Sequence, residues 1–300
     1  MSSVKKFVST KEKNAIESGV LYLVATPIGN LSDLSERAIK VLSEADIVAA
    51  EDTRNTAKLL SLLDISKPMI SYFEHNKRER GEEIVAHLKE GKTVVLVTDA
   101  GTPAISDPGE DLVVLCAKEG IKVTSVPGAC AAINALALSA LPTGRFVFEG
   151  FLPTSKRERR ERLSSLIAEE RTVIFYEAPH KLRNTLSDLL EAFGEARKIT
   201  LCREMTKLNE EVFRTTIGGA VAEYKERDPR GEYVLIMQGV DKAAKMLDAD
   251  ADARTVRERV EAYIEAGEEK KEAIKRVAKE MGLPRNAVYQ EMIENEDKNE

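Results

Sequence analysis

The strongest constraint on the fold is an alternation of apolar runs with helical periods between Gly19 and Val126. The runs at 20–26, 46–52, 68–73, 93–99 and 121–126 are apolar almost throughout. Strands in a sheet with one wet face would instead alternate apolar and polar residues. Apolar strands separated by helices therefore predict a parallel sheet that is covered on both faces.

Helical periods fill the gaps between these runs, at 31–45, 53–63, around 82–91 and at 111–119. Asp33 and Glu36 have the spacing of a capping box before the first of them. This spacing predicts that Asp33 caps the first helix.

A second unit follows Pro127, where 127–142 is rich in small residues that permit close helix packing. The segments 145–153, 171–179, 196–204, 211–219 and 232–239 supply about five further strands, with helices between the earlier ones. We expect an α/β protein with a polar N-terminal tail (1–18), two α/β domains (19–126 and 127–240), a charged linker (241–252) and a small C-terminal helical segment (253–300).

The helical segment contains a pattern typical of a helix-turn-helix. Ala273, Ile274, Val277, Ala278 and Met281 share one helical face, and Gly-Leu-Pro then forms a tight turn into another helix. Two interpretations stay open at this point: a small helical cap, or a module that contacts RNA or DNA.

Composition narrows the classes of partner. The net charge of -6 argues against a protein coated in positive charge for non-specific nucleic-acid binding. Two local basic runs, 75–80 and 155–163, are either solvated helix faces or RNA-binding patches. No apolar run approaches the roughly 20 residues of a membrane helix, and the N-terminus has no apolar core of signal-peptide type. Three widely spaced cysteines and three histidines favour a reducing cytoplasm and no metal site.

Polar loops follow all five strands of the first predicted sheet: 26–30, 51–56, 71–76, 99–109 and 125–130. Ligands of open parallel sheets bind at the carboxyl ends of the strands, so this edge is the predicted site. The phosphate-binding patterns GxxxxGK[ST] and GxGxxG are both missing. Acidic side chains suit ribose hydroxyls and ammonium groups, so the loops favour a nucleoside that bears an amino acid.

Several long segments in this order resemble the ribosomal small-subunit (16S) RNA (cytidine-2'-O)-methyltransferase family, usually called RsmI: 21–54, 71–76, 98–109, 125–142 and 175–182. The resemblance covers about 21–239 and continues into the helical tail; Phe73 departs from it, because the family often has histidine there. It implies a tetrapyrrole methylase-like fold in which S-adenosylmethionine (SAM) lies in a cleft between two α/β domains. It also implies a cytoplasmic homodimer that acts on 16S rRNA of the small ribosomal subunit.

The resemblance assigns cofactor-binding residues on both domains. They are Pro27, Asp99, Gly101, Thr102, Ser106, Ala129, Cys130, Phe175, Tyr176, Gly231 and Glu232. Simpler roles compete with some of these assignments: a turn aspartate for Asp99, and core packing for Phe175 and Tyr176.

A ribose hydroxyl needs a group that takes its proton or lowers its pKa. The candidates on the cleft-side loops are Glu51, Arg54, His75 and His180. For Glu51 and Arg54, together with Asp52, an ion-paired strand end is the competing interpretation.

Two rival functions remain at this stage. The same fold methylates tetrapyrroles or other small molecules, although the basic runs and helical tail favour RNA. An RNA-binding assembly factor without catalysis is the second rival, which the intact cleft loops argue against.

Overall fold

The computed structural model describes residues 15–240 and 255–293 of the chain. It divides into two compact units, residues 1–239 and 240–300, which are described separately below. Residues 1–14 of the predicted N-terminal tail and the whole predicted linker (241–252) lie outside the described residues. The predicted boundary between two α/β domains at 126/127 stays a prediction.

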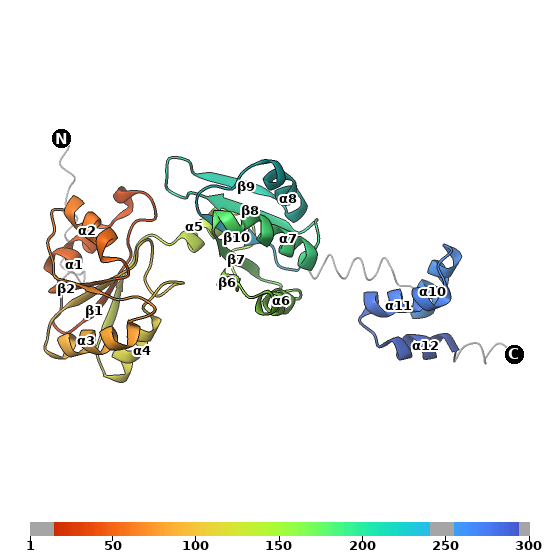
Figure 1. Ribbon diagram of the computed structural model, residues 1–300, viewed down its shortest axis with the longest axis horizontal. Coiled ribbons are helices and arrows are strands. Elements are labelled where there is room, and N and C mark those ends of the chain that lie inside the picture. Colours follow the sequence, from red (N-terminus) through yellow and green to blue (C-terminus); the bar gives the residue numbers. More distant parts are fainter. Residues whose placement is uncertain (1–14, 241–254, 294–300) are drawn as a thin grey trace. The chain divides into compact units, whose positions relative to one another are not determined.

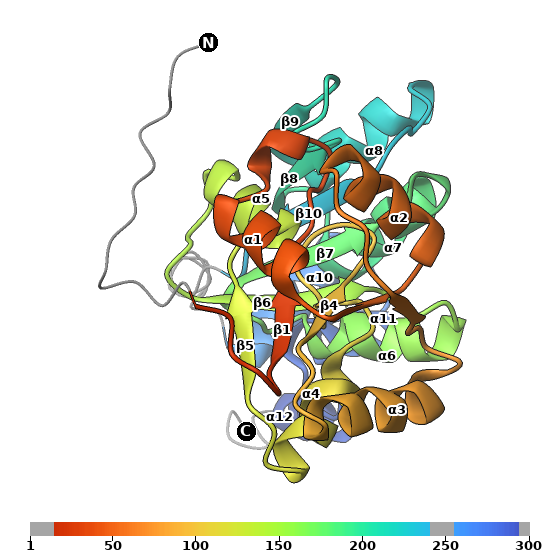
Figure 2. The same cartoon turned by 90° about the vertical axis from the view of Figure 1, so that its left-hand side faces the viewer.

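The first sheet is parallel, as the apolar runs predict. It comprises β1 (Leu21–Val24), β2 (Ile47–Ala50), β3 (Met69–Ser71), β4 (Val94–Val97) and β5 (Val123–Val126). Their order is β3-β2-β4-β1-β5, and every neighbouring pair is parallel. Strand β5 forms one edge, beside β1 (Figure 2).

Helices cover both faces of this sheet: α1 (Glu36–Glu44) and α2 (Thr53–Leu62) on one side, α3 (Lys77–Lys89) and α4 (Glu110–Lys118) on the other (Figure 1). Successive side chains of a strand point to opposite faces. Tyr22 and Val24 therefore pack with residues of α1 and α2, whereas Leu21 packs with residues of α3 and α4. Two apolar layers on one sheet explain why the strands are apolar throughout.

The predicted capping box at the first helix is wrong. Asn30 caps a short 3-10 helix, η1 (Leu31–Asp33), so Asp33 lies inside that turn. Helix α1 begins three residues later, where the Ser35 hydroxyl accepts a hydrogen bond from the backbone N–H of Ala38.

The second sheet is mixed. It comprises β6 (Phe146–Phe151), β7 (Thr172–Glu177), β8 (Lys198–Arg203), β9 (Glu211–Thr216) and β10 (Tyr233–Met237), in the order β6-β7-β10-β8-β9. Strands β6 and β7 are parallel, and the remaining pairs are antiparallel. The carboxyl ends of β6 and β7 therefore meet at the same edge.

Each face of the second sheet has its own apolar cluster. Helix α5 (Ala131–Leu138), the small-residue helix, packs on the face that carries Ile174 and Ile236. The opposite face carries Phe175 and Leu235, beneath α6 (Lys156–Ser165), α7 (Leu182–Phe193) and α8 (Ile217–Glu226). The apolar contacts of the α5 face also include Ile28, from the loop after β1.

The second compact unit contains α10 (Val256–Glu265), α11 (Lys270–Met281) and α12 (Arg285–Ile293). The predicted apolar face of α11 is buried at Ala273, Ile274, Val277 and Ala278, but Met281 is largely exposed. Gly282 ends α11 in the left-handed conformation and leads into α12, as the predicted turn requires.

We predict that truncation after Asp248 leaves the melting temperature of the remaining unit within about 2 °C of the full chain. The reason is that its four apolar clusters consist of residues before 240, and the fifth consists of residues after 255. A shift of that size corresponds to less than about 1 kcal/mol in a unit of this length. Differential scanning calorimetry measures it, with Leu186→Ala as a core variant that lowers the melting temperature. A truncated chain that melts as early as that core variant would show instead that the helices support the α/β unit.

Candidate functional site

Backbone hydrogen bonds join three loops at the carboxyl edge of the first sheet. Thr26, after β1, and Gly101, after β4, exchange two backbone hydrogen bonds of 2.9 and 3.0 Å. The Thr26 hydroxyl also donates to the carbonyl of Thr98, 3.0 Å away. Farther along, the Thr102 hydroxyl donates to the carbonyl of Ala129, which lies after β5. Gly101, Thr102 and Ala129 are thus brought together, as predicted from their loops.

The loop after β4 holds two side chains in an unfavourable backbone conformation. Ala104 and Ser106 have φ values of +66° and +63°, in the left-handed region that residues with a Cβ seldom adopt. Such conformations persist where the surrounding structure enforces them, and they concentrate at functional sites. Ser106 in turn contacts the second sheet, because a Cβ added to Gly150 of β6 would lie 2.9 Å from its Oγ.

Three carboxylates gather around Thr98, at the end of β4. The Thr98 hydroxyl donates to Glu51 Oε2 at 2.9 Å. Asp99 is exposed and accepts a hydrogen bond of 2.9 Å from the side-chain amide of Asn55. Asp107 is partly buried and lies close to the Thr98 side chain. The edge therefore carries the acidic character that the sequence predicts.

Asp107 is a candidate site residue that the sequence assignments missed. Burial, and then the negative charges of Glu51 and Asp99, raise its pKa to about 6. A carboxyl group whose pKa is raised by burial and by neighbouring charges is a typical functional-site feature. Its signal in the sequence was its place in the 99–109 loop, between Ser106 and Pro108.

The structure separates Phe175 from Tyr176, because adjacent residues of a strand point to opposite faces. Phe175 is 0% exposed and packs beneath α6–α8, so its side chain belongs to the core. Tyr176 lies on the α5 face, where its hydroxyl accepts a hydrogen bond from the N–H of Ala132. Burial, together with the neighbouring Cys130 and Asp107, raises the pKa of Tyr176 to about 12. Of this pair, Tyr176 is the residue near the acidic loop.

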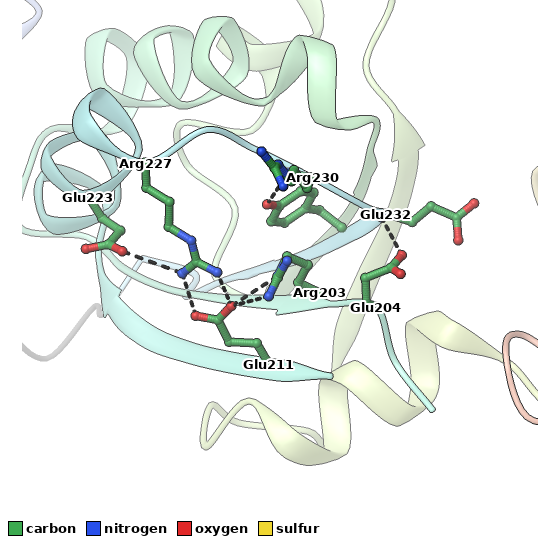
Figure 3. A network of polar contacts seen from close by, with 8 residues as sticks. Arg203, Glu204, Glu211, Glu223, Arg227, Arg230 and Glu232 are labelled. Carbon is green, nitrogen blue, oxygen red and sulfur yellow. Dashed lines mark hydrogen bonds and ion pairs between the residues drawn. The ribbon is translucent and has the colours of Figure 1, made fainter. Parts of the chain in front are cut away.

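Gly231 and Glu232 approach the first loop through Lys207. The Lys207 ammonium donates to Glu204 Oε1 and Glu232 Oε2 at 2.8 and 2.9 Å, and its aliphatic chain lies against Gly29. Glu204 also accepts from the N–H of Glu232 at 3.0 Å (Figure 3), and a Cβ on Gly231 would overlap the Glu204 carboxylate. Arg203 and Arg227 meet on Glu211 beside this segment (Figure 3).

The four proton-transfer candidates separate in the structure. Glu51 joins the carboxylate group, as described above. Arg54 is 85% exposed and pairs with Asp52 at 2.7 Å, which favours the ion-paired strand end for these two residues. His75 is exposed against the ring of Phe73, and His180 is exposed in the 3-10 helix η2 (Pro179–Lys181). Within 15–240 and 255–293, no hydrogen bond or ion pair links either histidine to the carboxylates.

Pro27 and Cys130 flank this arrangement. Pro27 is partly exposed directly after the Thr26–Gly101 bridge. Cys130 is a free thiol at the N-terminus of α5, and its carbonyl accepts from the side-chain amide of Asn134.

Among the described residues, no group of three or more His, Cys, Asp or Glu side chains is suited to hold a metal ion. In the same part of the chain, no helix has both the length and the apolar character needed to cross a membrane.

Comparison with known proteins shows what the chain is similar to. The model of the family "Tetrapyrrole (Corrin/Porphyrin) Methylases" matches residues 20–221. The chain is 48% identical to ribosomal RNA small subunit methyltransferase I of Halalkalibacterium halodurans, over 91% of this chain and 94% of that protein. It is 45% identical to the protein of the same name from Synechocystis sp., over 93% and 99%.

Solved structures of tetrapyrrole methylases share the fold at low sequence identity. A cobalt precorrin-4 methyltransferase matches with a TM-score of 0.56 and 19% identity, over 73% of this chain and 95% of that one. Uroporphyrin-III C-methyltransferase from Thermus thermophilus, complexed with S-adenosylhomocysteine, matches with a TM-score of 0.50 and 20% identity, over 72% and 96%.

We predict that replacing Asp107 with asparagine stabilises the protein increasingly as the pH rises from about 4 to about 7. An aspartate in an unfolded chain has a pKa of about 3.9, below the folded value of about 6. A carboxyl group whose pKa is higher in the folded state reduces the free energy of unfolding once it ionises. Its contribution to stability is therefore fully present below the pKa of the unfolded chain and is lost as the pH rises through the pKa of the folded state. Asparagine does not ionise, so the variant should gain about 1–2 kcal/mol over wild type, after allowance for solvent screening.

Urea unfolding at both pH values measures this difference, and carbon-13 NMR titration of the Asp107 carboxyl measures its pKa directly. Glu51→Gln is the matched variant, because it removes one of the two charges that raise the pKa and should lower it. A wild-type pKa near 4, unaffected by Glu51→Gln, contradicts the proposed coupling.

Proposed function

Because this chain belongs to the ribosomal RNA small subunit methyltransferase I family, within the tetrapyrrole (corrin/porphyrin) methylases, we propose that it methylates 16S rRNA. The reaction is transfer of a methyl group from SAM to the ribose 2'-hydroxyl of a cytidine in the small ribosomal subunit. The observation that carries the proposal is identity of 45–48% to such methyltransferases over more than nine-tenths of the chain.

The residues at the edge of the first sheet fit SAM. This ligand carries a positive sulfonium and an ammonium group, and its ribose hydroxyls donate hydrogen bonds. Glu51, Asp99 and Asp107 supply negative charge and acceptor oxygens around Thr98. Arg54, the nearby cation, is already paired with Asp52. The donor set therefore favours a cationic ligand over a polyphosphate.

We assign the parts of the ligand by chemistry and by the family resemblance. The acidic loop after β4 (Asp99, Gly101, Thr102, Ser106) would hold the amino-acid and ribose portions. Ala129 and Cys130 after β5, Tyr176 of β7 and the Gly231–Glu232 backbone would surround the adenosine, with Pro27 beside the methyl donor. Phe175 would contribute through its backbone alone, since its side chain is in the core.

When bound, SAM supplies an electrophilic methyl group on a positively charged sulfur. The protein must align the acceptor hydroxyl, exclude water and receive the hydroxyl proton. Among the four sequence candidates, Glu51 is the one joined to the carboxylate group, and Asp107 extends that group. With a pKa of about 6, Asp107 is ionised at neutral pH and can hold a proton on its carboxylate. We assign proton acceptance to this pair rather than to Arg54, His75 or His180.

A second acceptor class, a tetrapyrrole or another small molecule, is favoured by the fold alone. The similar solved structures are named as methyltransferases of such compounds, but at 19–20% identity they show only that the fold is shared. The relatives named for ribosomal RNA are more than twice as similar in sequence. We therefore propose RNA as the acceptor.

Two further assignments follow from the proposed function and the resemblance. The proposed substrate supports a cytoplasmic location, with the small ribosomal subunit as the partner. The family resemblance suggests a homodimer, which sedimentation of the purified chain tests.

The direct test is methyl transfer from labelled SAM to small ribosomal subunits that lack the modification. We predict labelling of 16S rRNA and no labelling of a free tetrapyrrole such as uroporphyrinogen. Nuclease digestion followed by mass spectrometry should then identify a 2'-O-methylcytidine. Labelling of the tetrapyrrole but not of the particles would favour the second acceptor class.

The variant Asp99→Ala tests whether the acidic loop binds SAM. Loss of a charge-assisted hydrogen bond, about 1.5–3 kcal/mol, should weaken SAM binding by about ten- to a hundredfold in calorimetry. Asp33→Ala, an exposed aspartate of η1, is the control and should bind SAM as wild type does. An Asp99→Ala protein that binds SAM with wild-type affinity would exclude the acidic loop as the donor site.

A further inference from the structure

An exposed aromatic ring lies at the rim of the proposed donor site. Phe151, the last residue of β6, is 56% exposed and pairs in register with Tyr176 of β7. The two rings meet edge to face, with centroids 5.6 Å apart. Tyr176 is itself held by the hydrogen bond from Ala132 and by an edge contact with Phe148. The Phe151 ring therefore rests on a fixed support while much of its surface stays open.

A β-bulge turns this ring to the Tyr176 face of the sheet. Phe148 and Phe151 are three residues apart and would point to opposite faces of a regular strand. The register shift between Phe148 and Gly150 places an extra residue in β6, so both rings share the Tyr176 face. At the bulge, Gly150 has φ +62° and lies against Ser106 of the acidic loop. The same distortion thus brings Gly150 onto the loop and places the Phe151 ring against Tyr176, whose pKa is raised in part by Asp107 of that loop.

A groove of about 860 Å³ lies over the face of the second sheet opposite to the Phe151 ring. Its lining starts with Leu152, Pro153 and Thr154 and continues between α6 and α7. Because β6 and β7 are parallel, both helices start at the edge of the sheet that carries Phe151.

The cations of this groove are of two kinds. Arg159 is 15% exposed and donates to Asp188 and Thr185, so it is part of the structure. Lys156, Arg160 and Lys181 also line the groove, and in the described residues no hydrogen bond or ion pair engages their side chains. These three lie in the first half of α6 and directly before α7, at the end nearest Phe151. Glu191, the unpaired acidic residue of the lining, lies near the opposite end of α7.

We infer that Phe151 and the cations Lys156, Arg160 and Lys181 form the docking surface for a single-stranded segment of the RNA substrate, in which Phe151 stacks on an unpaired base. Proteins that bind single-stranded RNA stack its unpaired bases on aromatic rings and bind its phosphate backbone through lysine and arginine. The ring and the cations lie on opposite faces but at the same carboxyl edge of β6 and β7, where Gly150 lies against the loop that carries the proposed donor-binding carboxylates, so a strand of RNA that crosses this edge would meet both. This inference rests on the proposed function, because it supplies the acceptor side of that same site.

The inference predicts two separable losses of RNA affinity. Phe151→Ala should weaken binding by about 5- to 100-fold, the typical range for one stacked base, without changing the salt dependence. A Lys156→Gln, Arg160→Gln double variant should instead reduce the slope of log Kd against log salt by about 1.4, because each phosphate contact on a single strand contributes about 0.7.

Fluorescence anisotropy with a labelled single-stranded RNA of about twelve nucleotides measures both effects. Phe151→Trp should restore binding and Phe151→Leu should not, because leucine is apolar but offers no ring for stacking. Phe146→Ala and Lys118→Gln are the matched controls: Phe146 is an exposed ring at the other end of β6, and Lys118 is an exposed cation at the end of α4. Melting temperature and SAM affinity of every variant verify that the fold and the donor site are intact.

Several outcomes would overturn the inference: wild-type affinity in Phe151→Ala, equal losses in the Phe146→Ala control, or displacement of the RNA by polyglutamate of the same length. The last would mark this groove as a surface for acidic protein. Methyl transfer to small-subunit particles is measured in parallel. If wild type methylates particles but Phe151→Ala binds RNA normally, the docking surface is wrong and the proposed function stands. If wild type binds RNA through Phe151 but methylates no particles, the proposed function fails alone.

Discussion

The pair of backbone hydrogen bonds between Thr26 and Gly101 is the interaction on which the site depends. It crosses from the loop after β1 to the loop after β4, and the Thr26 hydroxyl adds a third bond to the same segment. The Thr102 bond to Ala129 extends the connection to the loop after β5. Three loops on adjacent parallel strands are thereby held as one surface, which lets the β4 loop keep Ala104 and Ser106 in unfavourable conformations.

The second constraint is the negative charge that the joined loops bring together. Without a cation, the carboxylates of Glu51, Asp99 and Asp107 repel one another, and Asp107 holds its proton to about pH 6. A ligand with a positive sulfur relieves this repulsion, which an additional phosphate would increase. The acceptor side has the opposite sign at Lys156, Arg160 and Lys181. The proposed site for the cationic donor and the proposed surface for the polyanionic acceptor thus have opposite charge, as a reaction between SAM and RNA requires.

Periodicity predicted the first sheet well, because strands buried on both faces have an unmistakable apolar signature. It also led to the loops after β1, β4 and β5. Periodicity did not predict the direction in which each individual side chain points. Phe175 and Tyr176 look equivalent in the sequence, yet pleating sends Phe175 into the core beneath α6–α8 and Tyr176 to the α5 face. Likewise Arg159 is indistinguishable from Arg160 until α7 presents Asp188. The raised pKa of Asp107 arises first from its burial and then from charges 56 and 8 positions away in the sequence, and no local pattern encodes these causes.

The most direct test of the account is calorimetric binding of SAM between pH 5 and pH 7.5, in buffers of different ionisation enthalpy. If the acidic loop binds the sulfonium and ammonium groups, SAM should bind more tightly as Asp107 ionises near pH 6, with release of a proton from the protein below that pH. S-adenosylhomocysteine, which lacks the sulfonium charge, should show a smaller dependence, as should SAM with Asp107→Asn. An affinity for SAM that is independent of pH, with no proton released, would contradict the assignment of this edge as the methyl-donor site.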